Sequence, residues 1–207
     1  MSDDPAPVPG APSGGARERI MVAALRCVER DGVRGFSLED VAAEAGVSRT
    51  TVYRHFPEGR SQLVQETATW EVGRFWSRIA TAVAEQPTLE DRLVEGLLMG
   101  TRMIRRSRIM ANLMDPDLDE LVSALRPAEP LVHTVIADYL RALLEDEAAA
   151  GRLRPGTDPA EAADYLTRMI LSVLGSPAGV DLTDAEATRD LVRRQFLAGI
   201  VVPPSGK

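Results

Sequence analysis

The chain has 207 residues, of which 44% are hydrophobic and 4% aromatic, and its formal net charge is -7. It contains no long uncharged apolar run and a single cysteine, which excludes a membrane-spanning helix and an internal disulfide. Residues 1–60 are nearly neutral, so the acidity lies mostly in the remainder, and a local basic surface can form near the N-terminus. Because the first residues lack a basic patch followed by an apolar stretch, we expect a cytoplasmic protein with no membrane partner.

The N-terminal segment divides into a tail and a helix. Residues 1–13 are rich in Pro, Gly, Ser and Asp and are expected to form a disordered leader. Residues 16–31 are predicted to be helical, because apolar side chains recur on one stripe, at Ile20, Ala24, Cys27 and Val28. Gly32 then ends the helix. Cys27 lies on the stripe, which favours a buried small hydrophobe over a redox-active thiol.

Residues 37–56 have the pattern of two short helices joined by a tight turn. Ser37 can cap the first helix, and Asp40 can act as the acidic partner of a capping box. Gly46 suits a helix end that requires positive φ, and Ser48 can cap the second helix.

The second helix is predicted to expose polar side chains. Val52 and Phe56 are its apolar positions, which leaves six residues outside the buried face: Arg49, Thr50, Thr51, Tyr53, Arg54 and His55. Arginine can bind guanine through two hydrogen bonds, threonine can reach a base edge, and tyrosine and histidine can reach phosphate. A helix, a short turn and a polar second helix form the helix-turn-helix arrangement, in which the second helix lies in the major groove of DNA.

This segment, AxxAGVSRTTVYRHF with its preceding helix, resembles the DNA-binding domain of the tetracycline-repressor (TetR) family of bacterial regulators. The resemblance implies that Arg17 contacts the DNA backbone, for which a solvated surface arginine is the alternative. The family commonly has a phosphate-binding lysine where this chain has Gly59, and the adjacent Arg60 or the N–H groups at the next helix start can replace it. We expect DNA contacts from Arg17, Ser37, Ser48, Arg49, Thr50, Thr51, Tyr53, Arg54, His55 and Arg60.

The rest of the chain is predicted to be helical as well. Apolar spacing and turn residues predict helices over 63–84, 89–109, 118–125, 131–150, 160–174 and 183–201. With no alternating strand pattern and no internal repeat, the expected fold is an all-α bundle. We expect a DNA-binding domain over 14–74, an effector-binding and dimerisation domain over 75–202, and a frayed tail over 203–207.

The last two predicted helices carry more apolar residues than packing on one neighbour requires. The TetR resemblance implies that they form a four-helix interface with a second copy of the chain, and a wholly internal core is the alternative. The expected interface residues are Tyr165, Met169, Ile170, Val173, Leu191, Phe196 and Ile200. A homodimer places two reading helices about 34–36 Å apart, as a palindromic operator in double-stranded DNA requires.

The middle helices are candidates for a ligand pocket. Adaptable apolar side chains and one histidine suggest such a pocket, and the expected pocket residues are Trp70, Trp76, Met99, Met103, Met110, Met114 and His133. Ordinary core packing is the alternative for each apolar residue, and a satisfied histidine is the alternative for His133. The cluster Arg102, Arg105, Arg106 and Arg108 suits a solvated helix end, and a lesser hypothesis turns one of these arginines inward to a ligand carboxylate.

These features favour a transcriptional regulator. By family resemblance it is a homodimeric repressor that a small lipophilic effector of unknown identity releases from its operator. The alternative is a small-molecule-binding or protein-interaction module that keeps the helix-turn-helix as a scaffold. No Gly-rich phosphate loop, catalytic triad spacing or metal-ligand cluster occurs, so we expect no catalytic residues, no metal, no cofactor and no enzyme activity.

Overall fold

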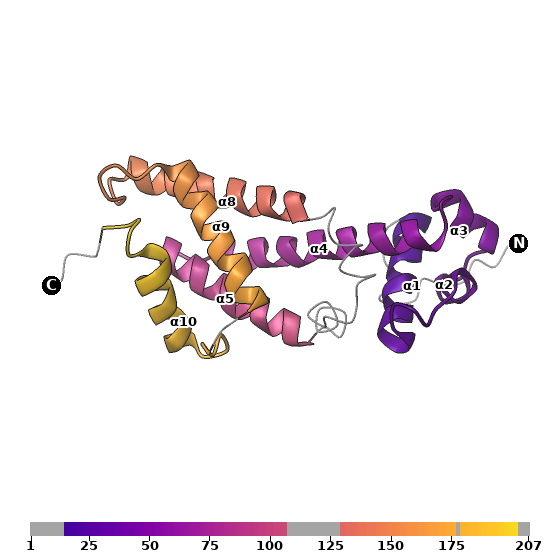
Figure 1. Ribbon diagram of the computed structural model, residues 1–207. Helices are drawn as coiled ribbons and strands as arrows, with labels where there is room; N and C mark the ends of the chain where they lie inside the picture. Colours follow the sequence, from indigo (N-terminus) through magenta and orange to yellow (C-terminus); the bar gives the residue numbers. More distant parts are fainter. Residues whose placement is uncertain (1–14, 107–128, 177–178, 203–207) are drawn as a thin grey trace, which may run out of the picture. The chain divides into compact units, whose positions relative to one another are not determined.

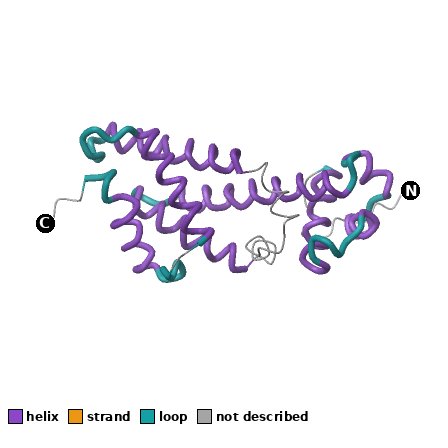
Figure 2. Tube along the Cα trace, in the orientation of Figure 1, coloured by secondary structure: helices purple, strands orange, loops and turns teal. Residues whose placement is uncertain are grey.

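The computed structural model describes residues 15–106, 129–176 and 179–202 (Figure 1). Within these ranges the regular elements are helices, and the one β-bridge is an isolated antiparallel pair between Leu153 and Val201 (Figure 2). The all-α prediction is therefore confirmed. The predicted leader 1–13, the helix 118–125 and the tail 203–207 lie outside the described residues.

The chain divides into two compact units, Met1–Ala68 and Thr69–Lys207, which we call the N-terminal and C-terminal units. The division falls within helix α4, Arg60–Ala84, a few residues before the expected boundary at residue 74.

The N-terminal unit contains three helices and the start of α4. They are α1 (Ala16–Asp31), α2 (Leu38–Ala45) and α3 (Arg49–His55), and all three pack against one another. Their shared core is built from residues that are fully or almost fully buried: Ile20, Ala24, Cys27, Val41, Val52, Phe56 and Leu63. The expected burial of Cys27 is confirmed, and this burial raises the pKa of its thiol, which disfavours the reactive thiolate.

Over its described residues, the C-terminal unit comprises the rest of α4 and five further helical elements. These are α5 (Leu89–Arg106), α8 (Glu129–Ala149), α9 (Pro159–Gly175), α10 (Ala185–Leu191) and the π-helix η2 (Val192–Leu197). Helix α8 packs along α9, while α5 contacts α9, α10 and η2. Their common core includes the fully buried side chains of Leu97, Leu144, Leu166 and Phe196.

The last predicted helix differs from the structure at both ends and in its winding. It begins at Ala185 rather than 183, ends at Leu197 rather than 201, and is π-helical from Val192 onward. A π-turn holds one residue more than an α-turn, and the apolar periodicity used for the prediction does not reveal it.

The expected dimer residues fall into two groups. Leu191, Phe196 and Ile200 are buried within the single chain, where they pack in the core of the C-terminal unit, so the internal-core alternative describes them better. Tyr165 is 39% exposed, and its hydroxyl donates a hydrogen bond of 2.6 Å to the Gln195 carbonyl of the π-helix. Met169, Ile170 and Val173 are partly buried on the same helix, α9.

A cluster of ion pairs joins the start of α5 to α10 and η2. Arg189 Nη1 contacts Glu90 Oε1 at 2.5 Å and Asp91 Oδ1 at 2.8 Å, and Arg193 Nε contacts Glu90 Oε2 at 2.9 Å. The two carboxylates lie in the first turn of α5, where the helix dipole also favours negative charge. Thr88 Oγ1 accepts a hydrogen bond from the Asp91 N–H, so the predicted cap at Thr88 is confirmed.

Replacing Arg189 with glutamine is expected to lower stability near neutral pH and to have a smaller effect toward pH 3. Hydrogen bonds from Thr88 and Arg189 lower the pKa of Asp91 below its ordinary value of 3.8. Burial raises the pKa of Glu90, but the hydrogen bonds from Arg193 and Arg189 outweigh burial and lower this pKa below 4.5. Carboxyls with depressed pKa values stabilise the fold above their ordinary pKa, and this contribution is lost as pH falls through the folded-state pKa.

The expected loss is about 1 kcal/mol near pH 7, the upper end for partly exposed pairs. Thermal unfolding followed by circular dichroism at about pH 7, 5 and 3 measures it. A difference between variant and wild type that is the same at all three pH values would contradict the assignment.

Candidate nucleic-acid interface and ligand pocket

The helix-turn-helix is held by the two caps and the glycine that the sequence predicted. Ser37 and Asp40 form a full capping box: Ser37 Oγ accepts from the Asp40 N–H at 3.2 Å, and the Ser37 N–H donates to Asp40 Oδ2 at 2.8 Å. The Ser37 hydroxyl also donates to Asp40 Oδ2 at 2.6 Å, and this bond together with the one from the Ser37 N–H lowers the pKa of the Asp40 carboxyl. Gly46 lies in the left-handed region with φ 64°. Ser48 Oγ accepts from the Thr51 N–H at 3.1 Å and begins α3.

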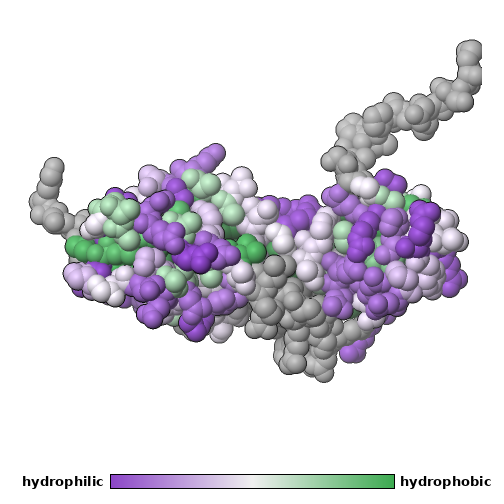
Figure 3. Space-filling view, turned by 90° about the horizontal axis from the view of Figure 1, so that it is seen from above, coloured by the Kyte–Doolittle hydropathy of each residue, from purple (hydrophilic) through white to green (hydrophobic). Residues whose placement is uncertain are grey.

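Helix α3 has one buried face and one polar face. Val52 and the following Phe56 are completely buried. Four of the six residues expected on the outside are exposed: Arg49, Thr50, Tyr53 and Arg54. Hydrophilic residues also predominate on the visible face of the N-terminal unit, at the right of Figure 3. This polar face of α3 is the candidate DNA-reading surface.

Two of the expected α3 contacts are less accessible. Thr51 is half-buried, and its Oγ1 lies 2.9 Å from Ser48 Oγ, so both hydroxyls interact locally. His55 is half-buried too, and within the described residues its Nε2 atom is buried without a hydrogen-bond partner.

Arg49 contacts two neighbouring side chains on the polar face of α3. Its guanidinium pairs with Glu39 of α2 at 2.5 Å and lies 5.6 Å from the centre of the Tyr53 ring. The sequence did not reveal the role of Glu39, because its proximity to Arg49 depends on the angle between the two helices. Arg49 and Tyr53 therefore form one pair on the candidate DNA-reading surface.

Arg17 and Arg60 make contacts inside the N-terminal unit. The Arg17 guanidinium pairs with Glu66 of α4 and lies 4.9 Å from the centre of the Phe56 ring. The Arg60 guanidinium donates to the backbone carbonyls of Val33 and Phe36. Phosphate binding by either arginine stays a prediction. For Arg60, the guanidinium that would bind phosphate is already hydrogen-bonded to the segment before α2.

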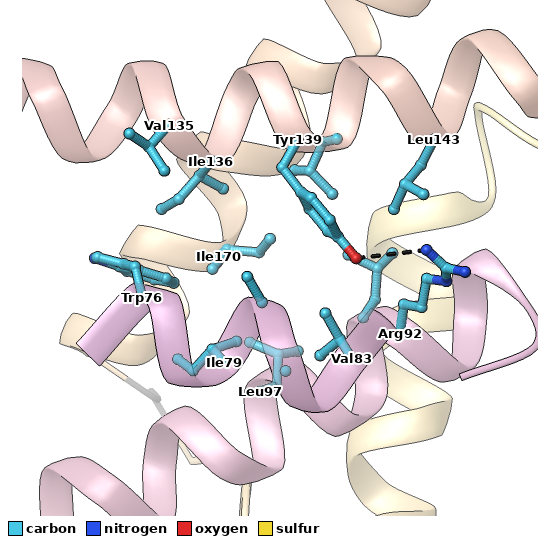
Figure 4. A pocket seen from close by; sticks show the side chains of 14 residues that line it. Trp76, Ile79, Val83, Arg92, Leu97, Val135, Ile136, Tyr139, Leu143 and Ile170 are labelled. Atoms are coloured by element: carbon cyan, nitrogen blue, oxygen red, sulfur yellow. Dashed lines mark hydrogen bonds between the residues drawn. The ribbon is translucent and has the colours of Figure 1, made fainter. Parts of the chain in front are cut away.

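The C-terminal unit encloses an apolar pocket among α4, α5, α8 and α9 (Figure 4). It holds about 590 Å³ of empty space, including space open to solvent, and 14 residues line it. Trp76, Ile79 and Val83 of α4 form one wall, and Ile136 and Tyr139 belong to the α8 wall.

Trp76 is the only expected pocket residue that the structure places in the lining, among those it describes. Trp70 lies against Arg74 instead, with 4.5 Å from the guanidinium carbon to the ring centre. Met99 and Met103 pack on the cluster of Phe75, Ile79 and Val83. His133 Nε2 lies 3.1 Å from Asp164 Oδ1. Met110 and Met114 lie outside the described residues.

A single charged side chain, Arg92 of α5, lines this pocket. Its Nε donates to the Gln86 carbonyl at 2.9 Å, and its Nη1 makes a long 3.5 Å bond to the Tyr139 hydroxyl. The sequence suggested other arginines, Arg102 to Arg108, for the inward position. Of those, Arg102 pairs with Glu95 at 4.0 Å and Arg105 with Asp181 at 3.8 Å, and Arg108 lies outside the described ranges.

The described residues lack two other kinds of site. They contain no group of three or more His, Cys, Asp or Glu side chains that could hold a metal ion. None of the helices assigned in these ranges combines the length and the apolar character needed to cross a bilayer.

An all-α chain with an N-terminal helix-turn-helix, a polar reading helix and a larger helical unit with an apolar pocket belongs to the class of DNA-binding regulators. Residues 20–67 match the family model described as "Bacterial regulatory proteins, tetR family". The matched segment, residues 20–67, is therefore a DNA-binding domain of the TetR type.

Several regulators are similar to the chain in sequence or in fold. An uncharacterized HTH-type transcriptional regulator of Mycobacterium tuberculosis is 25% identical over 92% of this chain and 87% of its own length. The complex of SmeT with triclosan has a TM-score of 0.57 and 22% identity, covering 91% of this chain and 92% of that one. SmeT is described as the repressor of the Stenotrophomonas maltophilia multidrug efflux pump SmeDEF. FadR of Bacillus subtilis in complex with stearoyl-CoA has a TM-score of 0.58 and 17% identity, covering 88% and 98%.

Proposed function

We propose that the chain is a homodimeric repressor that binds a palindromic operator through α3 and is released by a small lipophilic effector. The exposed polar face of α3 carries the proposal. Arg49, Thr50, Tyr53 and Arg54 are exposed on a helix whose other face is anchored by the buried Val52. A helix kept only as a scaffold needs no guanidinium and aromatic pair on its outer side, and these groups suit base edges and phosphates.

We propose a dimer because a single reading helix contacts too few base pairs to recognise an operator. One helix reads only a few base pairs, whereas two helices about 34–36 Å apart read both halves of a palindrome. The surface we propose for association is the outer side of α9, with Tyr165 at its exposed position. The buried residues Leu191, Phe196 and Ile200 belong to the same core cluster as residues of α9, behind this surface.

Release requires an effector that distinguishes two states of the dimer. A ligand shifts an equilibrium only by the difference between its affinities for the two states. The pocket in the C-terminal unit suits this role because it is apolar and is lined from four helices. The effector would bind more tightly to the state of the dimer in which the spacing of the two reading helices does not fit the operator than to the DNA-bound state.

The direct test uses the purified chain and DNA from its own promoter neighbourhood. Fluorescence anisotropy should show binding at least about 1,000-fold tighter than to random duplex of the same length, with affinity falling steeply as salt rises. Mass photometry should show two chains per operator. Equal binding to both duplexes, or one chain on the operator, would overturn the proposal.

A further inference from the structure

We infer that the pocket binds an amphiphilic monocarboxylate, with its apolar body along α4 and its carboxylate on Arg92 and Tyr139. This inference specifies the effector class and rests on the proposed function for any effect on DNA binding. Binding to the pocket does not depend on DNA and can be measured without it.

The apolar body is suggested by the shape and chemistry of the lining. Trp76 and Val83 lie seven residues apart on α4, a separation of about 10 Å at 1.5 Å per residue. Figure 4 shows Trp76 at one end of this wall and Arg92 at the other, with aliphatic side chains between them. An elongated apolar molecule therefore fits the wall with one end at the guanidinium.

The charge of the head group is suggested by the surroundings of Arg92. A guanidinium in partly apolar surroundings is costly unless it is paired, and across the described residues no carboxylate pairs with Arg92. The neighbouring Asp91 is already bound to Arg189. Only Nε and one N–H of Nη1 are used by Gln86 and Tyr139, so further N–H groups remain for a ligand.

Tyr139 completes the site as a second donor. Its hydroxyl oxygen accepts from Arg92, which leaves the hydroxyl proton free to donate to a ligand oxygen. Both side chains offer donors to a carboxylate, and the positive charge of Arg92 repels an ammonium group. Arginine also binds carboxylates in a planar, two-bond geometry that an alcohol cannot reproduce. The pocket should therefore prefer an acid to an alcohol or amine of equal length.

Tryptophan fluorescence tests this preference. The chain has two tryptophans, and Trp70→Phe leaves Trp76 in the pocket wall as the single reporter. Octanoate, 1-octanol and octylamine are titrated into this variant. Octanoate should change the Trp76 emission at concentrations about 10-fold or more below those required for the other two.

The matched variants are Arg92→Leu and Arg102→Leu, both on α5, made in the same background. Arg92→Leu should weaken octanoate by about 10- to 100-fold and leave 1-octanol within about twofold. Arg102→Leu, which removes a surface arginine, should change neither. Arg92→Lys should recover part of the octanoate affinity, because it restores the charge without the planar fork. Circular dichroism checks that each variant is folded.

Two results would overturn the inference: equal affinity for octanoate and 1-octanol in the parent variant, or equal octanoate loss in the Arg92 and Arg102 variants. Octanoate is then added to the complex with promoter DNA. If it binds the pocket without releasing the DNA, the carboxylate site stands and the effector step of the proposed function fails. If selective DNA binding is absent but octanoate binding is retained, the DNA-binding proposal alone fails.

Discussion

Replacing Arg49 and Tyr53 together by alanine should reduce operator affinity by about 100- to 1,000-fold, to the level of random duplex. The two side chains form one pair on the exposed face of α3, so the double variant removes a base-reading guanidinium and a phosphate-reaching hydroxyl at once. Val52 and Phe56 keep α3 anchored, and the free energy of unfolding should stay within about 1 kcal/mol of wild type.

Anisotropy with operator and random duplexes measures this effect, and urea unfolding checks the fold. Arg141→Ala is the control, because Arg141 is an exposed arginine of α8 in the C-terminal unit. It should leave operator affinity within about twofold of wild type. An Arg49 and Tyr53 double variant that still binds its operator selectively would show that α3 does not read the DNA.

Phe56→Ala should cost about 3–5 kcal/mol and disable the N-terminal unit while leaving the pocket functional. The Phe56 side chain is completely buried at the end of α3, and Arg17 loses the ring it lies against. Operator binding should therefore be lost on warming. Ligand binding should survive, because every residue of the pocket lining belongs to the C-terminal unit.

Hydrogen exchange measured by mass spectrometry separates the two units in the intact chain. Protection should fall in α1 to α3 and persist in α8 and α9. Phe56→Leu serves as the graded control, since it keeps much of the buried volume and should cost less than half as much. Uniform loss of protection along the whole chain would show that the two units unfold as one.

The helix-turn-helix was predictable because its signals are local. A cap at Ser37, a left-handed residue at Gly46 and a second cap at Ser48 each follow from a few neighbouring residues, and all three are observed. The accessibility of α3 was harder to predict. His55 lies at its end, and whether that side chain is half-buried depends on how α3 packs on its neighbours.

The pocket was harder to predict because its lining depends on packing between distant helices. Met99 and Met103 looked like flexible pocket walls, yet they face the Phe75 cluster. Arg92 was missed since it follows Glu90 and Asp91 at a helix start, a pattern typical of a solvated surface. Only the approach of Tyr139, 47 residues later, identifies it as the polar group of the pocket.

The contact between Arg49 and Glu39 has a consequence for target search. A free arginine gains from any phosphate it meets, and so it slows a protein along DNA of arbitrary sequence. Arg49 must first give up a carboxylate at 2.5 Å, so a poorly oriented phosphate brings little net gain. On the proposed reading surface, two aligned hydrogen bonds to guanine would exceed that small loss, so the acidic neighbour would favour guanine over an arbitrary phosphate.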